Sequence, residues 1–392
     1  MRSYNATVSP LLLNSIGQLA EKEGIGFERL TRAVAGLSFL FTKERAALRR
    51  PYLEEPVFAS AYLQYFLPVN LSKIQVLLNE MPAPEAGEQF SVLDLGSGPG
   101  TGAMAVLDWW HERRETGALS IVAVDCSSMV HRQAKQLWDH YCRIASLAEA
   151  TLWTCDSDIE RNAWCGQVGK GAPFDLIILA NSLNEMYADA KDPIAARAAL
   201  MTEALSLLAP QGTLMIVEPA LRETSRALHQ LRDQLLQEKR CTVYSPCLHE
   251  KSCPALVNPD DWCHEERAWE PPSAIQKMDE VVGFIKDALK FSYLLLRKDG
   301  NTIVERRSDI YRVVSELREL KGEKRAWLCN EQGRQEVGRQ DRLTSPQNTD
   351  LDRWHRGAIV QIERVVRKER AGKVSSLGRI EQDAAVQIIR PV

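Results

Sequence analysis

Two short stretches of the sequence hold the residues best suited to chemistry. Residues 245–267 read SPCLHEKSCPALVNPDDWCHEER, with three cysteines and two histidines. Residues 91–105 read SVLDLGSGPGTGAMA, an apolar run that ends in glycines. The first pattern suits a metal centre, because thiolates and imidazoles are ligands that zinc and iron–sulfur clusters prefer. The second suits a nucleotide-like cofactor, because glycines let a ligand approach the backbone closely.

The glycine loop favours one cofactor class. It places Asp94 before three glycines, which are Gly96, Gly98 and Gly100. The letters PGTG follow the second glycine, where a dinucleotide loop would have a two-residue gap. Asp125 ends the next apolar run, where its carboxylate can accept bonds from two ribose hydroxyls. This pattern indicates S-adenosylmethionine; a different nucleotide, or a fold that binds nothing, are the alternatives.

Over roughly residues 85–300 the chain resembles the class I S-adenosylmethionine-dependent methyltransferases. The first motif of that family falls on Asp94, Gly96, Ser97, Gly98 and Gly100, and the acid of the second falls on Asp125. The resemblance implies that Asp156 or Asp158 lies near the adenine. It also implies that Asn181, at the end of the fourth strand, lines the pocket.

Methyl transfer itself is not predicted by a motif. Residues 181–186 read NSLNEM, without the prolines and aromatic residue of an NPPY-like turn. Cys155 follows the third strand, which does not suit the cysteine nucleophile of a carbon methyltransferase. Asn184 and Glu185 either orient a substrate or cap the following helix.

The cysteine spacing is Cys247-x5-Cys253-x9-Cys263, which matches neither a zinc ribbon nor a bacterial ferredoxin. A fourth ligand is needed, and His249, His264 and the distant Cys329 are candidates. Four thiolates would hold a [4Fe–4S] cluster, whereas three thiolates and a histidine would suit zinc. From the spacing alone both remain open.

The combination resembles the methyltransferase-like assembly factors of the mitochondrial small ribosomal subunit and their bacterial homologues. The Cys-Pro at 253–254 and the WCHEER at 262–267 carry most of this similarity. The resemblance implies a [4Fe–4S] cluster on Cys247, Cys253, Cys263 and Cys329, placed to clip the core to the C-terminal part. It also implies a small-subunit rRNA partner.

Periodicity predicts an α/β fold: a class I methyltransferase-like, doubly wound sheet flanked by two smaller parts. We expect a helical N-terminal segment over residues 1–82, a cofactor-binding domain over 83–300 and a small OB-like β domain over 301–392. The cysteine-rich metal insert would occupy residues 241–270. Apolar spacing predicts a helix from residue 272 to residue 290.

The overall charge is −3, yet residues 321–379 hold 14 Lys/Arg against 8 Asp/Glu. This local excess favours a polyanionic partner. The proposed phosphate track consists of Arg364, Arg367, Lys368, Arg370 and Lys373. Trp354 could stack on a base between Arg353 and Arg356, or pack inside the β domain instead.

No apolar run is long enough to span a membrane, and the first residues lack a signal-peptide or presequence pattern. We therefore expect a protein of the bacterial cytoplasm, rather than of the mitochondrial matrix. We also expect it to be a monomer when free. Three functions remain: a small-subunit assembly factor, an active rRNA methyltransferase, or a zinc-containing methyltransferase of a non-ribosomal substrate. The basic C-terminal region disfavours the third.

Overall fold

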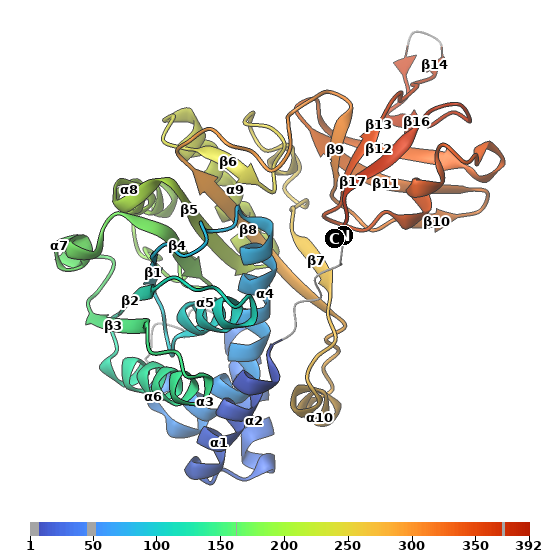
Figure 1. Cartoon of the computed structure of the whole chain (residues 1–392). Coiled ribbons are helices and arrows are strands. Elements are labelled where there is room, and N and C mark those ends of the chain that lie inside the picture. The colour runs from blue at the N-terminus through green and yellow to red at the C-terminus, as the bar shows by residue number, and fades with distance from the viewer. Residues whose placement is uncertain (1–7, 45–51, 162, 371–372) are drawn as a thin grey trace.

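A computed structural model describes residues 8–44, 52–161, 163–370 and 373–392. Figure 1 shows three parts along the chain: blue N-terminal helices, a central sheet with its helices, and an orange-to-red C-terminal β part. The α/β fold expected from the periodicity is confirmed.

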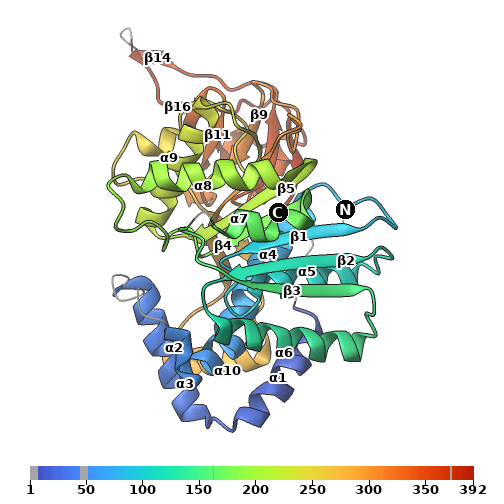
Figure 2. The ribbon, with the colours of Figure 1, turned by 90° about the vertical axis from the view of Figure 1, so that its left-hand side faces the viewer.

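The N-terminal helices begin and end at local signals. The helices are α1 (Pro10–Glu23), α2 (Phe27–Thr42), α3 (Pro56–Ala61) and α4 (Leu67–Glu80), with a 3-10 turn at Tyr52–Glu54 and a π-helical turn at Tyr62–Phe66. The Ser9 side chain accepts a bond from the Leu12 amide at the start of α1, and Gly24 ends that helix in the left-handed region. Figure 2 shows α1, α2 and α3 together at the foot of the molecule.

The central sheet has the order β3-β2-β1-β4-β5-β8-β6, with β7 paired to β8. The five parallel strands are β1 (Phe90–Leu95), β2 (Leu119–Asp125), β3 (Ala150–Asp156), β4 (Phe174–Ala180) and β5 (Leu208–Pro219). The strand β8 (Ala288–Arg297) runs antiparallel to β5. The sheet is therefore mixed, with a reversed pair at one edge.

Helices cover both faces of this sheet. They are α5 (Thr101–Glu112), α6 (Ser128–Ala145), α7 (Ala163–Val168), α8 (Pro193–Leu207) and α9 (Arg222–Gln237), with a 3-10 turn at Gly169–Gly171. Side chains alternate along β1: Val92 joins the core beneath α5 and the N-terminal helices, and Leu93 joins the core beneath α8 and α9. Each face buries its own apolar cluster, as a doubly wound fold requires.

The cysteine-rich stretch connects two strands, β6 and β7, that both pair with β8. Its elements are β6 (Thr242–Ser245), a 3-10 turn at Pro254–Leu256, β7 (Glu265–Ala268) and α10 (Ser273–Val282). The prediction of a helix from residue 272 to residue 290 is wrong in its second half. The helix ends at Gly283, whose φ of 77° stops it, and Ala288 and Leu289 already belong to β8.

The C-terminal part is a sheet of order β16-β12-β11-β9-β13-β17, with β10 beside β11. Its strands are β9 (Ile310–Val313), β10 (Arg318–Leu320), β11 (Glu323–Asn330), β12 (Gly333–Gln340), β13 (Ile359–Ile362), β16 (Leu377–Arg379) and β17 (Val386–Arg390). Two 3-10 turns, Asp341–Leu343 and Thr349–Arg353, lie between β12 and β13. A small hairpin, β14 (Glu369–Arg370) and β15 (Lys373–Val374), projects from it.

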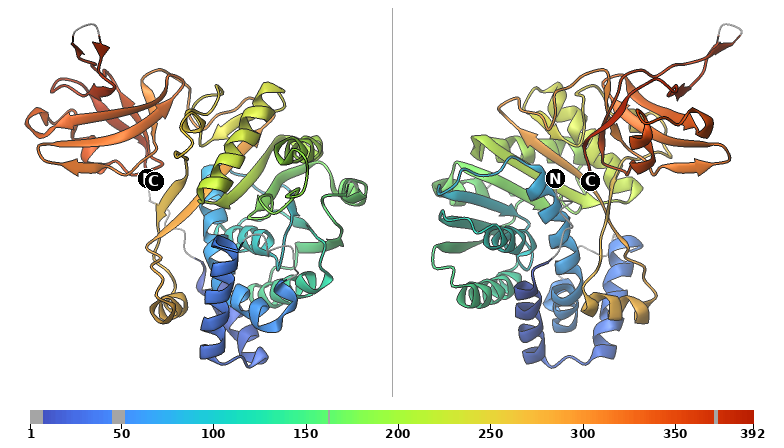
Figure 3. Two further views of the ribbon diagram at one scale, coloured as in Figure 1. Left: turned by 180° about the vertical axis from the view of Figure 1, so that it is seen from behind. Right: turned by 45° about the vertical axis from the view of Figure 1, so that its right-hand side comes forward.

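This C-terminal sheet has two buried faces. Tyr311 and Val313 point into its own core, while Ile310 and Ile359 join the large core of the central domain. Figure 3 shows the resulting contact, with the C-terminal part attached beside β7 and β8. Within the described ranges, no helix is both long and apolar enough to cross a membrane.

Candidate cofactor pocket and thiol site

The loop between β1 and α5 depends on glycine. Gly96, Gly98 and Gly100 have φ values of 68°, 51° and 86°, which side chains adopt at a cost. A Cβ on Gly96 would also lie 2.5 Å from the Cβ of Ser182, which follows β4. The loop is thus pressed against the end of β4, where a cofactor would lie in a fold of this type.

Asp94 has a structural place beneath this loop. The carboxylate is 1% exposed, and its Oδ2 accepts a bond of 3.0 Å from the Ala103 amide at the start of α5. A Cβ on Gly102 would meet the same carboxylate at 2.5 Å. Burial raises the pKa of Asp94 to about 7, despite that amide. Asp94 therefore orients the helix that carries the loop.

The other predicted cofactor residues surround the loop. Asp125 accepts bonds from the amides of Gly98 at 2.9 Å and Ser127 at 3.0 Å, so it fixes the loop as well as facing it. Asp156 pairs with the ring of His131 on α6. Ser97 is 4% exposed, and its hydroxyl has no hydrogen-bond partner within the described part of the chain. An unpartnered buried hydroxyl in a glycine loop is a group that a bound ligand would satisfy.

A second unpartnered group lies where β4 and β5 end. Asn181 has a φ of 58°, and its amide bonds to the Val217 carbonyl at 2.7 Å. Glu218, one residue further, is 2% exposed; its Oε1 accepts a bond from the Asn184 amide at 3.3 Å. Its Oε2 has no hydrogen-bond partner among the residues described. Burial raises the pKa of Glu218 to about 8, so this carboxyl can stay protonated near neutral pH.

Sequence reasoning missed two tyrosines beside this pocket. The Tyr62 hydroxyl lies 3.4 Å from Thr101 Oγ1 at the start of α5. Burial, followed by the charge of Glu185, raises the pKa of Tyr52. The N-terminal segment therefore lies beside the glycine loop and the end of β4. The π-helical turn at Tyr62–Phe66 has no reliable sequence signature, although such turns are frequent at functional sites.

The four cysteines of the predicted metal site come from four points of the chain. Cys247 follows β6, Cys253 precedes a 3-10 turn, Cys263 precedes β7, and Cys329 lies on β11. Burial, and then the negative charge of Cys247, raises the pKa of both Cys253 and Cys329; for Cys263 the same causes raise it to about 12. The thiols are thus near enough to repel one another when ionised.

Ligand geometry is not formed around them. Across the described residues, no group of three or more His, Cys, Asp or Glu side chains is arranged to hold a metal ion. Thiolates on one zinc ion would each lie about 2.3 Å from it, hence under about 4 Å from one another. The four thiols are therefore close enough for their charges to interact, although they are not arranged around a common metal position.

Basic and imidazole groups border the thiols. Arg232 is fully buried, donates to the Lys251 carbonyl at 2.9 Å, and has its pKa raised by the charges of Cys247, Asp233 and Cys253 against the effect of burial. His249 Nε2 lies 3.7 Å from Cys329 Sγ. Burial lowers the pKa of His249 to about 4, so the ring is neutral at pH 7 and could serve as the alternative ligand. His264 stacks on Trp262, with ring centres 6.0 Å apart.

Several of the predicted RNA-contacting residues are buried or paired with other residues of the protein. The stacking role for Trp354 is wrong, because that side chain is 2% exposed in the C-terminal core. Arg364 pairs with Asp383 at 2.7 Å, and Arg367 donates to the Ser375 carbonyl at 3.0 Å. Lys368 is exposed. The side chains of Arg370 and Lys373 lie outside the description.

Fold and loop together define a class. A parallel β3-β2-β1-β4-β5 sheet extended by an antiparallel strand, with a glycine loop after β1, is the class I S-adenosylmethionine-dependent methyltransferase fold. Residues 56–341 match the family described as mitochondrial small ribosomal subunit Rsm22. The chain belongs to this family. The match includes the glycine loop and all four cysteines.

Several solved structures are similar at low identity. A class I S-adenosylmethionine-dependent methyltransferase of Listeria monocytogenes is 13% identical, with a TM-score of 0.38 over 73% of this chain and 85% of that one. A methyltransferase of Pyrococcus furiosus is 13% identical, with a TM-score of 0.34 over 58% and 82%. A precorrin-6y C5,15-methyltransferase of Geobacter metallireducens is 10% identical, with a TM-score of 0.32 over 57% and 87%. A search of curated proteins gave no match.

Proposed function

We propose that this chain is an S-adenosylmethionine-binding, iron–sulfur-containing factor that binds the RNA of the small ribosomal subunit during assembly. The observation that carries the proposal is the family match over residues 56–341, which contains both the glycine loop and the four thiols. The family description names a mitochondrial subunit, so the bacterial cytoplasm stays a prediction.

The cofactor half of the proposal rests on unsatisfied groups. Ser97, Gly98 and Asp125 would hold the cofactor, with Asn181 and Asp156 further along the same edge; the Ser97 hydroxyl fits this role because it is buried and unpartnered. The cofactor would supply an activated methyl group. The chain would bind and orient it, with Tyr62 and Thr101 closing the side next to α5.

The metal half rests on the donor set. A [4Fe–4S] cluster is bound by four cysteine thiolates. Here the four would be those of Cys247, Cys253, Cys263 and Cys329. The buried Arg232 beside Cys247 and Cys253 would offset part of their negative charge. Zinc on three of the thiols and His249 is the alternative, favoured by the 3.7 Å distance from that ring to Cys329.

The second candidate function is active rRNA methylation. The observation that favours it is Glu218, a buried carboxyl with one unpartnered oxygen at the end of β5. A protonated carboxyl there could donate a hydrogen bond to an acceptor base. Transfer of labelled methyl groups to RNA in immature small subunits would support this function, and no transfer to any such particle would exclude it.

The test of the main proposal is anaerobic purification with iron, sulfide and zinc analysis and a visible spectrum. The variant is Cys329→Ser and the control is Cys165→Ser, a half-buried cysteine beside Glu203. About four irons and four sulfides in the wild type and the control, lost in the variant, would support the cluster. One zinc that survives Cys329→Ser would show that Cys329 is not a ligand and that His249 or His264 completes the site.

A further inference from the structure

Cys263 of the cysteine insert and Cys329 of the C-terminal sheet each lie near a charged residue. Glu265 follows Cys263 by two residues, and Arg312 lies opposite Cys329. Cys329 on β11 pairs directly with Arg312 on β9 in the antiparallel ladder. Residues directly opposite in such a ladder project to the same face. Their neighbours Leu328 and Val313 turn to the other face, into the C-terminal core. Arg312 and Cys329 therefore face the central domain together.

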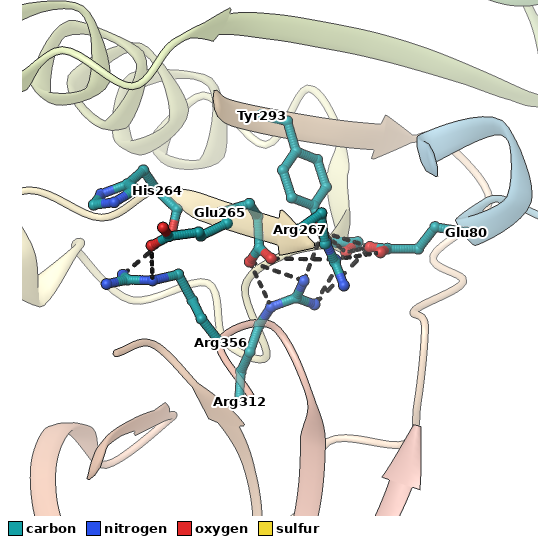
Figure 4. Close-up of polar contacts among 9 residues, drawn as sticks. Glu80, His264, Glu265, Arg267, Tyr293, Arg312 and Arg356 are labelled. Carbon is teal, nitrogen blue, oxygen red and sulfur yellow. Dashed lines mark hydrogen bonds and ion pairs between the residues drawn. The ribbon is translucent and has the colours of Figure 1, made fainter. Parts of the chain in front are cut away.

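Arg312 binds the segment that carries the other cysteine. Its Nε and Nη2 donate to Glu265 Oε1 at 3.1 and 3.0 Å, and Glu265 lies two residues after Cys263. Nη2 also donates to the Tyr293 hydroxyl on β8 at 2.8 Å. Figure 4 shows Arg312 rising from the C-terminal sheet to meet Glu265 and Tyr293 of the central sheet.

Two more charges close this group. Arg267 Nη2 lies 3.1 Å from Glu80 Oε2, at the end of α4, and 3.1 Å from Glu265 Oε2. Two carboxylates thus face two guanidinium groups, and the side chains of all four are at most 11% exposed. We call Glu80, Glu265, Arg267 and Arg312 the interdomain ion network. It joins the N-terminal helices, the cysteine insert and the C-terminal sheet.

The backbone at Gly357 packs directly against the interdomain ion network. Gly357, with a φ of 92°, approaches so closely that a Cβ there would lie 2.3 Å from Glu265 Oε2. Its amide bonds to the Val313 carbonyl at 2.8 Å, next to Arg312. Burial would raise the pKa of Glu80, but the positive charges of Arg312 and Arg267 outweigh burial and lower it. Such a buried group keeps its geometry because separating its charges leaves each one uncompensated.

We propose that Arg312 and Glu265 are positioning residues, which hold Cys329 beside Cys263 before any metal is bound. This inference rests on the proposed metal site for its purpose, while the placement rests on the contacts above. Its consequence is that the metal does not join the two domains. The ion network joins them, and a metal would only have to bring thiols of one neighbourhood into ligand geometry.

The test is alkylation of the metal-free, full-length protein by N-ethylmaleimide, with the rate at each cysteine followed by mass spectrometry. In Arg312→Gln, Cys329 and Cys263 should react about tenfold faster than in the wild type, because the buried pair is broken. Arg312→Lys keeps the charge and should give an intermediate rate. The control is Arg307→Gln, which removes a half-exposed pair with Asp309 just before β9 and should change neither rate.

Cys155, buried in the central core, separates positioning from unfolding. Equal acceleration at Cys155, Cys263 and Cys329 in both Arg312 variants would overturn the proposal, since the effect would be global. Unchanged rates at Cys329 and Cys263 in Arg312→Gln would overturn it too. If Arg312→Gln does not fold, Arg312→Lys decides by the same comparison.

Measuring the metal content distinguishes a failure of this positioning role from a failure of the proposed metal site. Each protein is reconstituted with iron and sulfide, or with zinc alone, and its metal is counted. Suppose that the wild type takes up no metal and that Cys329 reacts selectively faster in Arg312→Gln. This result would contradict the proposed metal site and support the positioning role. A fully loaded Arg312→Gln protein with wild-type alkylation rates would defeat the positioning role and leave the metal site intact.

Discussion

At the scale of single residues, two buried carboxyl groups make the stability of the folded state depend on pH. Asp94 and Glu218 are both nearly inaccessible, and burial raises the pKa values of the two groups to about 7 and about 8. A carboxyl whose pKa is higher in the folded state binds its proton more tightly there. The folded state is consequently favoured at low pH, and this advantage falls as pH rises through the folded pKa.

We expect the melting temperature to fall between pH 5 and pH 8, and Glu218→Gln to remove part of that fall. The amide keeps the shape and cannot ionise, so the variant should gain on the order of 2–4 kcal/mol relative to wild type across this range. Thermal unfolding at several pH values measures it. The exposed Glu149→Gln is the control and should follow the wild type. Parallel curves for wild type and Glu218→Gln would contradict the assignment.

Two glycines of the loop offer a matched pair of substitutions. Gly98→Ala meets nothing within 4 Å and carries only the cost of its positive φ, about 1–2 kcal/mol. Gly96→Ala has the same φ cost and also collides with Ser182, which adds about 1–3 kcal/mol. Gly96→Ala should therefore unfold at lower temperature and lose S-adenosylhomocysteine binding by calorimetry. Equal effects of the two substitutions would show that Ser182 yields freely.

At the scale of elements, the N-terminal helices do more than cover the sheet. The π-helical turn at Tyr62–Phe66 brings a phenol to the first turn of α5. Two turns further along α5, Tyr141 on α6 donates to Asp108 at 2.8 Å. One helix is thus held at two points along its length, at its start beside the glycine loop by Tyr62 and toward its end by Tyr141.

This arrangement predicts a division of effects between two tyrosines. Tyr62→Phe should cost about 0.5–1.5 kcal/mol of stability and weaken S-adenosylhomocysteine binding several-fold, because the start of α5 loses a partner. Tyr141→Phe, which removes a bond to a carboxylate, should cost about 1.5–3 kcal/mol without changing affinity. Thermal melts and calorimetric titrations measure both. If Tyr141→Phe weakens binding as much as Tyr62→Phe, the cofactor does not lie beside Tyr62.

At the scale of the whole molecule, charge is distributed unevenly. The chain carries −3, while residues 321–379 carry an excess of cations. Several of these arginines pair with carboxylates of the C-terminal part, among them Arg325 with Glu323, Arg339 with Asp352 and Arg379 with Glu323. Fewer cations are therefore available to an anion than the composition indicates. Lys368 is exposed and directly precedes β14, the first strand of the small hairpin.

We predict that small-subunit rRNA binds with an affinity that falls as salt rises, and that Lys368→Ala reduces the slope of log affinity against log salt by about one. Lys135→Ala, an exposed lysine on α6, is the control and should leave the slope unchanged. Filter binding or fluorescence anisotropy at four salt concentrations measures it. A wild-type slope in Lys368→Ala would place the RNA on another face.

Local pattern was sufficient wherever the determining contacts are local. The glycine loop and the alternating strands and helices both indicated the right fold class. The end of α10 was missed because the apolar spacing continues past Gly283 into β8, and a stripe of apolar residues fits either element there. The burial of Trp354 was left open, since an aromatic side chain beside arginines suits either a core or a base.

The sequence by itself determined the class of fold and the glycine loop after the first strand of the sheet, because both depend on residues close along the chain. Only the tertiary structure decided what meets across long separations. Tyr62 reaches Thr101, and Arg312 beside Cys329 reaches Glu265 beside Cys263. The physical reason is that charge, size and hydrogen-bonding capacity state what a side chain needs, whereas the packing of sheets and helices decides which distant residue supplies it.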